Sequence, residues 1–278
     1  MKFTVLTLFP EITGAYFASS IMAKALEKGV IQYRAVNIRD FALDKHKTCD
    51  DAPYGGGPGM LMLAEPLSRA LESVGTRKSA AGMPPHDNSP VCEANRNGRD
   101  AAGAEKPHVI YLTPSGRPFT QRWAQELAAM EELVLICGRY EGIDQRIVDS
   151  YVDDELSVGD YVLSSGEIAA LAVIDTVYRL VDNVITPESL NEESFNGGLL
   201  EYPQYTRPEI FDTMKVPEIL LSGHHEHIRK WRLKKRVEKT LAVRPELAEQ
   251  GLQEGLFDTE TVKYIEEGMK INERNKSD

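Results

Sequence analysis

The alternation of apolar and polar positions near the start of the chain predicts a parallel βαβ unit. Residues 3–8 have the pattern of a buried strand, residues 11–27 that of a helix, and residues 30–38 that of a second strand. Gly29 follows the predicted helix, in a position where glycine commonly ends helices because it adopts a left-handed backbone conformation. A strand, a helix and a strand in this order are typical of α/β folds with a parallel sheet.

The same patterns extend the predicted sheet further along the chain. In the helix predicted at 167–180, Ile168, Leu171, Ile174 and Val177 are spaced three apart and are expected to form the buried face. Parallel α/β sheets bind ligands at the carboxyl ends of their strands, so the loops that follow the strands are candidate sites. The other predicted elements are strands at 108–113, 133–137 and 157–163, and helices at 65–74, 121–130 and 143–151.

Two loops beside these predicted strands are rich in glycine and carboxylates. The first covers residues 138–142 (GRYEG), and the second covers residues 157–167 (SVGDYVLSSGE). Glycine permits positive φ angles and a close approach of the backbone to a ligand, so both loops suit a pocket made from main-chain groups. Glycine-rich turns also occur in α/β domains without a ligand, so glycine content alone leaves both interpretations open.

A long polar loop at 39–59 ends in the sequence GGGPG. It is not a P-loop, because no Gly-Lys-Ser or Gly-Lys-Thr follows it, and Met60 stands where the last glycine of GxGxxG would be. A flexible surface loop and a substrate-binding loop are both compatible with this sequence. His46, within the loop, reads as an exposed histidine.

Changes in composition predict the domain organisation. Residues 1–183 form the α/β domain, and within it residues 76–106 have the Gly, Pro, Ser, Asn and charge content of a disordered insertion. Residues 184–200 read as a polar linker between domains. Residues 201–278 read as a small helical domain.

The second domain holds the one strongly basic segment of the sequence. Its predicted helix at 226–241 has seven Lys or Arg residues and one acidic residue between positions 229 and 239. A charged helix face is commonly just solvated. Because the chain as a whole is acidic, and Trp231 and several histidines lie beside this segment, we favour a surface that contacts nucleic-acid phosphates.

Composition narrows the class of protein. A net charge of -11 over 278 residues argues against a protein that coats nucleic acid through bulk charge, but not against a local basic patch. The three cysteines have no CxxC or Cys/His spacing, so neither a disulfide framework nor a zinc site is predicted. No segment approaches the roughly 18 consecutive apolar residues of a membrane span, and the N-terminus does not resemble a secretory signal. We expect a cytoplasmic protein with no membrane partner.

Several blocks of the sequence, in one order, closely resemble the bacterial tRNA (guanine-N1) methyltransferases, which are the TrmD family of the knotted SPOUT superfamily. The most specific are CGRYEGID at 137–144 and SVGDYVLSSGE at 157–167. So many blocks in one order identify a family far more specifically than any single motif in the chain. The others are LFPE at 8–11, DDAPYGGGPGML at 50–61, YLTPSGRPF at 111–119, YPQYTRPE at 202–209 and LLSGHHEHIRKWRLK at 220–234.

The resemblance implies a fold, a cofactor and an assembly. It implies a parallel sheet with a deep trefoil knot, S-adenosylmethionine bound inside the knot, and a small all-α C-terminal domain. It also implies a homodimer with a composite active site, and Mg²⁺ as an auxiliary ion, although the sequence contains no dedicated ligand cluster for that ion. The residues that the resemblance assigns to the cofactor are Tyr111, Leu112, Pro114, Gly138, Tyr140, Glu141, Val158, Gly159, Asp160, Tyr161, Val162, Leu163, Ser165 and Gly166.

The reaction implied by the resemblance is methyl transfer to N1 of the guanosine immediately 3′ of the anticodon in tRNA. That nitrogen carries a proton at neutral pH, so a general base must remove it, and a nearby cation stabilises the negative charge that develops on the base. The resemblance assigns these two roles to Glu193 and Arg179. It assigns substrate binding to Gly59, Ser194, Arg207, Arg229, Arg232 and Arg236.

Three positions depart from the family pattern. Glu193 stands where the family has aspartate, Ser165 where it has glycine, and Ala169 where it has proline. Serine fits the cofactor loop if its φ angle is negative. Two other functions therefore stay open: a knotted ribose 2′-O methyltransferase, which needs no base for N1, and a non-catalytic RNA-binding relative whose site has decayed.

Overall fold

The computed structural model describes residues 1–76, 106–185 and 193–275. The chain divides into two compact units, Met1–Ile185 and Thr186–Asp278. The insertion expected at 76–106 and the middle of the linker expected at 184–200 lie largely outside the described residues. Within the described ranges, no helix is both long and apolar enough to cross a bilayer.

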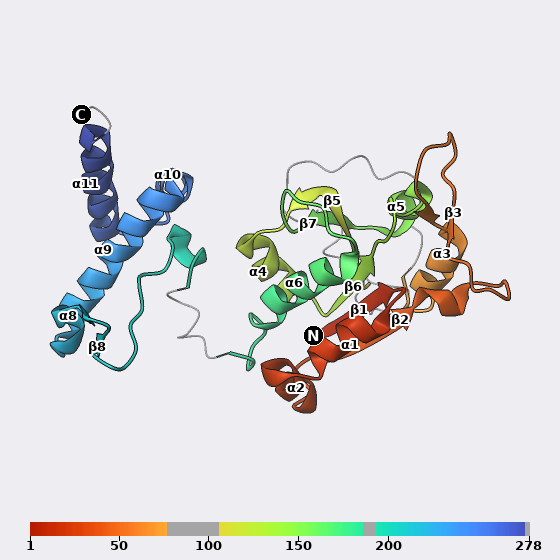
Figure 1. The fold of residues 1–278 in the computed structure, drawn as a ribbon, viewed down its shortest axis with the longest axis horizontal. Coiled ribbons are helices and arrows are strands. Elements are labelled where there is room, and N and C mark those ends of the chain that lie inside the picture. The colour runs from red at the N-terminus through yellow and green to blue at the C-terminus, as the bar shows by residue number, and fades with distance from the viewer. Residues whose placement is uncertain (77–105, 186–192, 276–278) are drawn as a thin grey trace. The chain divides into compact units, whose positions relative to one another are not determined.

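The first unit is built on a five-stranded sheet in which every pair of neighbouring strands is parallel (Figure 1). The predicted α/β class with a parallel sheet is confirmed. The strand that begins at His108 is longer than the predicted 108–113. It continues to Pro118, past an irregularity in the strand pairing after Leu112. The strands, in order across the sheet, are β2 (Gln32–Asn37), β1 (Lys2–Thr7), β6 (Glu132–Cys137), β5 (His108–Pro118) and β7 (Asp154–Ser157).

Helices cover both faces of this sheet, so its central strands are buried on both sides. Alternate residues of a strand point to opposite faces; in β6, Leu133 and Leu135 join one apolar cluster and Val134 and Ile136 join the other. One cluster includes residues of α1 (Pro10–Phe17), α2 (Ser20–Glu27), α4 (Gln121–Ala128) and α6 (Gly166–Tyr178). The other includes residues of α3 (Ala64–Glu72), α5 (Gln145–Tyr151) and the 3₁₀ helix η1 (Ile38–Phe41).

The single helix predicted at 11–27 is wrong, because the chain forms two helices there. α1 ends at Phe17 and α2 begins at Ser20, whose φ angle of 54° lies in the left-handed region. Such an angle is incompatible with a continuous helix. The break redirects the chain so that both Phe17 and Met22 reach the same apolar cluster.

Two further predictions near the second glycine-rich loop are wrong. The strand expected at 157–163 is β7, which ends at Ser157, and residues 158–165 form a loop in which Val162 is 83% exposed. The buried face of α6 also differs from the predicted one, because Ile168 is 53% exposed whereas Ile174 and Val177 are fully buried. Positions three apart drift around a helix by about 60° at each step, so four such positions do not share one face.

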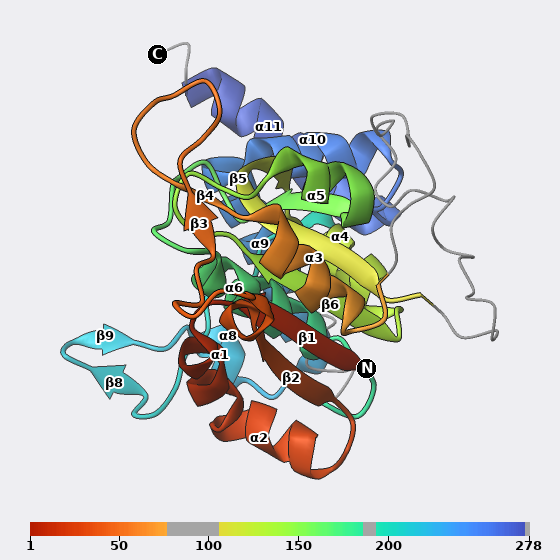
Figure 2. The same cartoon turned by 90° about the vertical axis from the view of Figure 1, so that its right-hand side faces the viewer.

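The second unit is mainly helical, and its small core lies between α9, α10 and α11. It also contains a short antiparallel hairpin of β8 and β9 (Figure 2), which the sequence analysis did not predict. The hairpin turns at Asp212 and Thr213, both with positive φ angles. The elements of this unit are η3 (Asn196–Gly198), β8 (Ile210–Phe211), β9 (Met214–Lys215), α8 (Glu218–Leu221), α9 (His225–Val243), α10 (Pro245–Gln253) and α11 (Thr259–Asn275).

Candidate functional site

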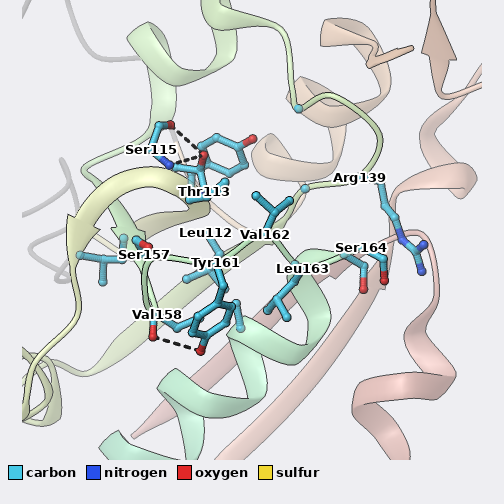
Figure 3. A pocket seen from close by; sticks show the side chains of 18 of the residues that line it. Leu112, Thr113, Ser115, Arg139, Ser157, Val158, Tyr161, Val162, Leu163 and Ser164 are labelled. Atoms are coloured by element: carbon cyan, nitrogen blue, oxygen red, sulfur yellow. Dashed lines mark hydrogen bonds between the residues drawn. The ribbon is translucent and has the colours of Figure 1, made fainter. Parts of the chain in front are cut away.

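A cavity of about 300 Å³ lies at the carboxyl edge of the sheet in the first unit. Three strand-end segments line it: 111–115 in β5, 138–142 after β6 and the loop after β7, with the first residues of α6 beside them (Figure 3). This is the edge where parallel α/β sheets bind ligands. All of the residues that the resemblance assigned to the cofactor line this cavity except Asp160, which is exposed beside it. The lining residues that were not predicted are Thr113, Ser115, Arg139, Gly142, Leu156, Ser157, Ser164 and Ala169.

The first residue of α6 packs directly on the end of β6. The backbone N–H of Gly166 donates a hydrogen bond to the carbonyl oxygen of Gly138 at 2.9 Å. A Cβ atom at Gly166 would lie 2.7 Å from both Cα of Cys137 and the backbone nitrogen of Gly138. Only glycine allows this approach, so the two glycine-rich loops meet through their main chains, as the site requires.

The serine at position 165 is compatible with the cofactor loop. Ser165 has a φ angle of -164° and a ψ angle of 153°, an extended conformation that any residue adopts. Ala169 lies one turn further along α6, lines the cavity and is buried. Neither departure from the family pattern distorts the loop, which weakens the argument for a decayed site.

The loop after β7 contributes apolar side chains to the cavity. The hydroxyl of Tyr161 donates a hydrogen bond to the carbonyl oxygen of Val158 at 3.2 Å, which closes the loop on itself (Figure 3). Tyr161, Val162 and Leu163 line the cavity but remain exposed. The apolar run that suggested a buried strand therefore forms a wall of the cavity instead.

The GGGPG segment lies against the loop that follows β6. It connects the short strands β3 (Asp50–Asp51) and β4 (Leu61–Met62), and the backbone N–H of Glu141 donates to the carbonyl oxygen of Met60 at 3.0 Å. Gly59 has a φ angle of +88°, and a Cβ atom there would lie 2.4 Å from Cγ of Glu141. The predicted substrate residue Gly59 is therefore next to the cavity although it does not line it.

Tyr140 connects the same two loops from the other side. Its hydroxyl donates a hydrogen bond to Asp50 at 3.2 Å, and its φ angle of 58° is in the left-handed region that a tyrosine rarely adopts. Burial and, next, the negative charge of Asp50 raise the pKa of the Tyr140 hydroxyl. The Tyr140 hydroxyl therefore keeps its proton, which it donates to Asp50, and this hydrogen bond ties the two loops together.

A buried acid and an arginine that sequence analysis missed lie directly behind the cavity wall. Glu167, in the first turn of α6, is fully buried and accepts a hydrogen bond from the hydroxyl of Thr7. Its second carboxyl oxygen lies 3.7 Å from Nε of Arg139, a lining residue. Burial and then the charge of Glu167 raise the pKa of the neighbouring Cys137 thiol well above its ordinary value.

The predicted general base lies in the second unit. Glu193 is half-buried, and its carbonyl oxygen accepts a hydrogen bond from the backbone N–H of Asn196 at 3.2 Å. The hydroxyl of Ser194 accepts a hydrogen bond from the backbone N–H of Glu201 at 3.1 Å. The segment that carries Glu193 therefore has a defined turn.

The arginines predicted to bind substrate contact other residues of the second unit. Arg229 forms ion pairs with Glu226 at 3.0 Å and with Glu260. The guanidinium of Arg232 lies 4.7 Å from the centre of the Tyr202 ring, and Arg236 donates hydrogen bonds to backbone carbonyls. Arg207 is exposed. Much of the positive charge of α9 therefore also stabilises the unit itself.

Arg179 and the cavity lie at opposite ends of α6. Arg179 is the residue that follows the last turn of this helix, whereas Ser165 and Gly166, at its start, line the cavity. Thirteen residues of α-helix have a length of about 20 Å. No group of three or more His, Cys, Asp or Glu side chains that could hold a metal ion is present among the residues that the structure describes.

Comparisons with known proteins identify the family of the chain. The family model described as tRNA (Guanine-1)-methyltransferase TrmD matches residues 1–250. A protein of Treponema denticola named tRNA (guanine-N(1)-)-methyltransferase is 58% identical over 267 residues, which cover 96% of this chain and 98% of that protein. Proteins with the same name from Treponema pallidum (56% identical, 89% of this chain and 88% of the relative) and Borrelia duttonii (53%, 86% and 89%) are also similar. The chain belongs to the TrmD family of tRNA (guanine-1)-methyltransferases.

Proposed function

We propose that this protein transfers a methyl group from S-adenosylmethionine to N1 of the guanosine immediately 3′ of the anticodon in tRNA. The observation that carries the proposal is the cavity between the loops after β5, β6 and β7, in a chain that belongs to the TrmD family. The names of its relatives describe the same activity on tRNA guanine N1. The position of the guanosine in tRNA comes from the sequence resemblance.

The residues around the cavity fit S-adenosylmethionine. Leu112, Leu156 and Leu163 offer apolar surface for the adenine ring, and the glycine-rich loops expose main-chain donors and acceptors for its polar edge. Glu141 is one of the lining residues, and a carboxylate suits the positive charge of the donor. When bound, this cofactor supplies an electrophilic methyl group.

We further propose Glu193 as the general base and Arg179 as the cation that stabilises the negative charge on the guanine. A carboxylate within about 2.6–3.2 Å of N1 can take its proton as the new N–C bond forms. The longer side chain of Glu193, relative to aspartate, keeps this chemistry and changes only its reach. A fixed cation beside O6 is most effective in a site from which water is excluded.

The distance between Arg179 and the cavity supports a homodimer. Ala169 of α6 lines the cavity and Arg179 follows it by ten residues, so about 15 Å of helix separates them. We therefore assign the cation beside the guanine to the Arg179 of a second copy rather than to that of the same chain. A second copy would bring its own Arg179 to the cavity, and the Glu193 segment of its second unit could approach in the same way. We therefore propose an active site that is shared between two protomers.

We propose that the chain from β5 to α6 forms the deep trefoil knot of the SPOUT superfamily. After β7, at the edge of the sheet, the chain returns to place Gly166 against Gly138 at the end of β6, two strands away. Such threading is rare in proteins. It brings the loops at both ends of the proposed knot around one ligand.

The second unit is proposed to bind the tRNA backbone. Among the α9 residues, Arg229 and the neighbouring lysines are exposed enough to contact phosphates. We also propose that Mg²⁺ acts as an auxiliary ion of the reaction. Activity measured before and after treatment with a chelator and dialysis tests its contribution.

The proposed function is tested by methyl transfer to defined tRNA transcripts. The purified protein is incubated with labelled S-adenosylmethionine and two transcripts that differ only at the guanosine 3′ of the anticodon, and the modified nucleoside is identified after digestion. We expect 1-methylguanosine from the first transcript and no transfer to the second. A ribose-methylated product, or equal labelling of both transcripts, would contradict the proposal.

A further inference from the structure

The carboxyl group of Glu167 is buried behind the cavity without a full set of partners. One oxygen accepts a hydrogen bond from the Thr7 hydroxyl at 2.5 Å. The other oxygen and Nε of Arg139 are both buried and make no hydrogen bond, although they lie only 3.7 Å apart. Burying a carboxyl group is costly unless its charge and hydrogen-bonding capacity are used, so this arrangement calls for an explanation beyond packing.

The partners of Glu167 connect three segments that are far apart in the sequence. Thr7 ends β1, and its hydroxyl also accepts a hydrogen bond from the backbone N–H of Phe9 at 2.9 Å. Arg139 follows β6, and its guanidinium lies 4.3 Å from the centre of the Phe9 ring. Glu167 itself begins α6. The carboxyl group is therefore the point where the ends of two strands and the start of a helix are held together.

Arg139 connects the carboxyl group of Glu167 to the residues that line the cavity. It lies between Gly138 and Tyr140, and the whole segment 138–142 lines the cavity (Figure 3). The neighbouring main-chain bond from Gly166 to Gly138 holds the same segment to α6. A small movement of Arg139 would shorten the 3.7 Å separation to that of a charge-assisted hydrogen bond. Glu167 is therefore placed to hold segment 138–142 in position.

We propose that Glu167 is a positioning residue for methyl-donor binding, which acts through Arg139 to hold segment 138–142 in the conformation that forms the cavity. This inference rests on the proposed function, and it assigns to Glu167 no contact with the donor or with tRNA. It accounts for a fully buried acid in an otherwise apolar part of α6. An apolar residue in its place would pack as well, but would give Arg139 no anionic partner.

Calorimetric titration with S-adenosylhomocysteine tests the proposal on the full-length protein. The variants are Glu167→Gln, Arg139→Gln and the double variant. We expect each single substitution to raise the dissociation constant roughly tenfold, because each removes the attraction between the Glu167 carboxyl group and the Arg139 guanidinium. Because the two residues act as one unit, the double variant should be no more than about twofold weaker than Arg139→Gln. Wild-type affinity in Glu167→Gln, or fully additive losses, would overturn the proposal.

Steady-state kinetics separate positioning from a general loss of structure. In Glu167→Gln, KM for S-adenosylmethionine should rise roughly tenfold, while kcat and KM for tRNA change by less than about twofold. Asp154→Asn is the matched control, because Asp154 is a buried carboxyl at the opposite end of the sheet that contacts His108 at 2.8 Å. It should lower the unfolding temperature without changing donor affinity. Equal effects of both variants on donor affinity would overturn the proposal.

Thr7→Val provides a second variant if Glu167→Gln does not fold. It keeps the carboxyl group and its volume but removes the hydrogen bond that orients it. We expect a rise of about threefold to tenfold in the dissociation constant for S-adenosylhomocysteine, and an unchanged value would overturn the proposal. Failure of the wild-type protein to bind S-adenosylhomocysteine at all would instead refute the proposed function on which this inference depends.

Discussion

Replacing Gly166 by alanine tests whether the cavity depends on the contact between α6 and β6. The added Cβ would lie 2.7 Å from two main-chain atoms, whereas ordinary contacts begin near 3.4 Å. Backbone atoms cannot rotate away, so the start of α6 must move by about 0.7 Å, the difference between these distances. Overpacking of this kind costs about 1–3 kcal/mol. At roughly 2–4 °C per kcal/mol for a domain of this size, the unfolding temperature should fall by about 2–12 °C.

The same movement should weaken donor binding, because Ser165, Gly166 and Ala169 line the cavity. We expect the dissociation constant for S-adenosylhomocysteine to rise at least about tenfold, which corresponds to about 1.4 kcal/mol. Gly14→Ala is the control, because Gly14 lies inside α1 and a Cβ atom there would meet nothing within 4 Å. That variant should be unchanged or up to about 1 kcal/mol more stable. If Gly166→Ala matched wild type in both unfolding temperature and affinity, the assigned role of the contact would be wrong.

Two further predictions concern the second unit. Thr240→Val leaves the buried N–H of Leu200 without its 2.9 Å acceptor and should lower the free energy of unfolding in urea by about 1–3 kcal/mol. As a control in the first unit, Thr176→Val removes only a solvent-exposed hydrogen bond within α6 and should cost less than about 0.5 kcal/mol. Asp258→Ala removes the acceptor for the N–H of Thr261 at the start of α11 and should cost about 1 kcal/mol. The hydrogen bond from Thr261 lowers the pKa of Asp258, so its contribution is complete above the unfolded value of about 3.9 and is lost as the pH falls through the lower folded value. A difference between wild type and Asp258→Ala that stayed constant from pH 7 to about pH 2 would contradict this assignment.

The sequence predicted the parallel sheet well because its central strands are buried on both faces. The run Leu133 to Cys137 is apolar at every position, and such runs are typical of strands covered by helices on both sides. The loop after β6 was also located correctly, because glycines at 138 and 142 indicate a close approach or a positive φ angle. The apolar run and the glycines each lie within a few adjacent residues, so both can be recognised in a single sequence.

The errors occur where a local pattern has two physical explanations. The apolar residues Tyr161, Val162 and Leu163 could belong to a buried strand or to the wall of a ligand cavity, and periodicity alone does not distinguish them. The two helices at 10–27 are separated by Ala18 and Ser19, and the second begins at Ser20. The left-handed conformation of Ser20 has no sequence signal comparable to a glycine or a proline.

Glu167 was missed for a different reason. An acid in the first turn of a helix is normally explained by the helix dipole, and here its partner Thr7 lies 160 positions away in the sequence. The signal that could have revealed it is the composition of the helix, because residues 168–174 contain no other charged side chain. An isolated acid beside such a segment is costly to bury and points to a specific partner.

The basic helix α9 connects the two roles proposed for the second unit. Arg236 donates hydrogen bonds to the carbonyl oxygens of Leu200 and Asn196 at 3.2 and 3.3 Å, and the N–H of Asn196 donates to the carbonyl oxygen of Glu193. The helix proposed to contact tRNA therefore also holds the turn that carries the proposed general base. Because a phosphate that competed for Arg236 would loosen this turn, the phosphate contacts are better assigned to exposed cations such as Lys239. Under the proposed function, α9 thus binds tRNA with one set of charges and positions Glu193 with another.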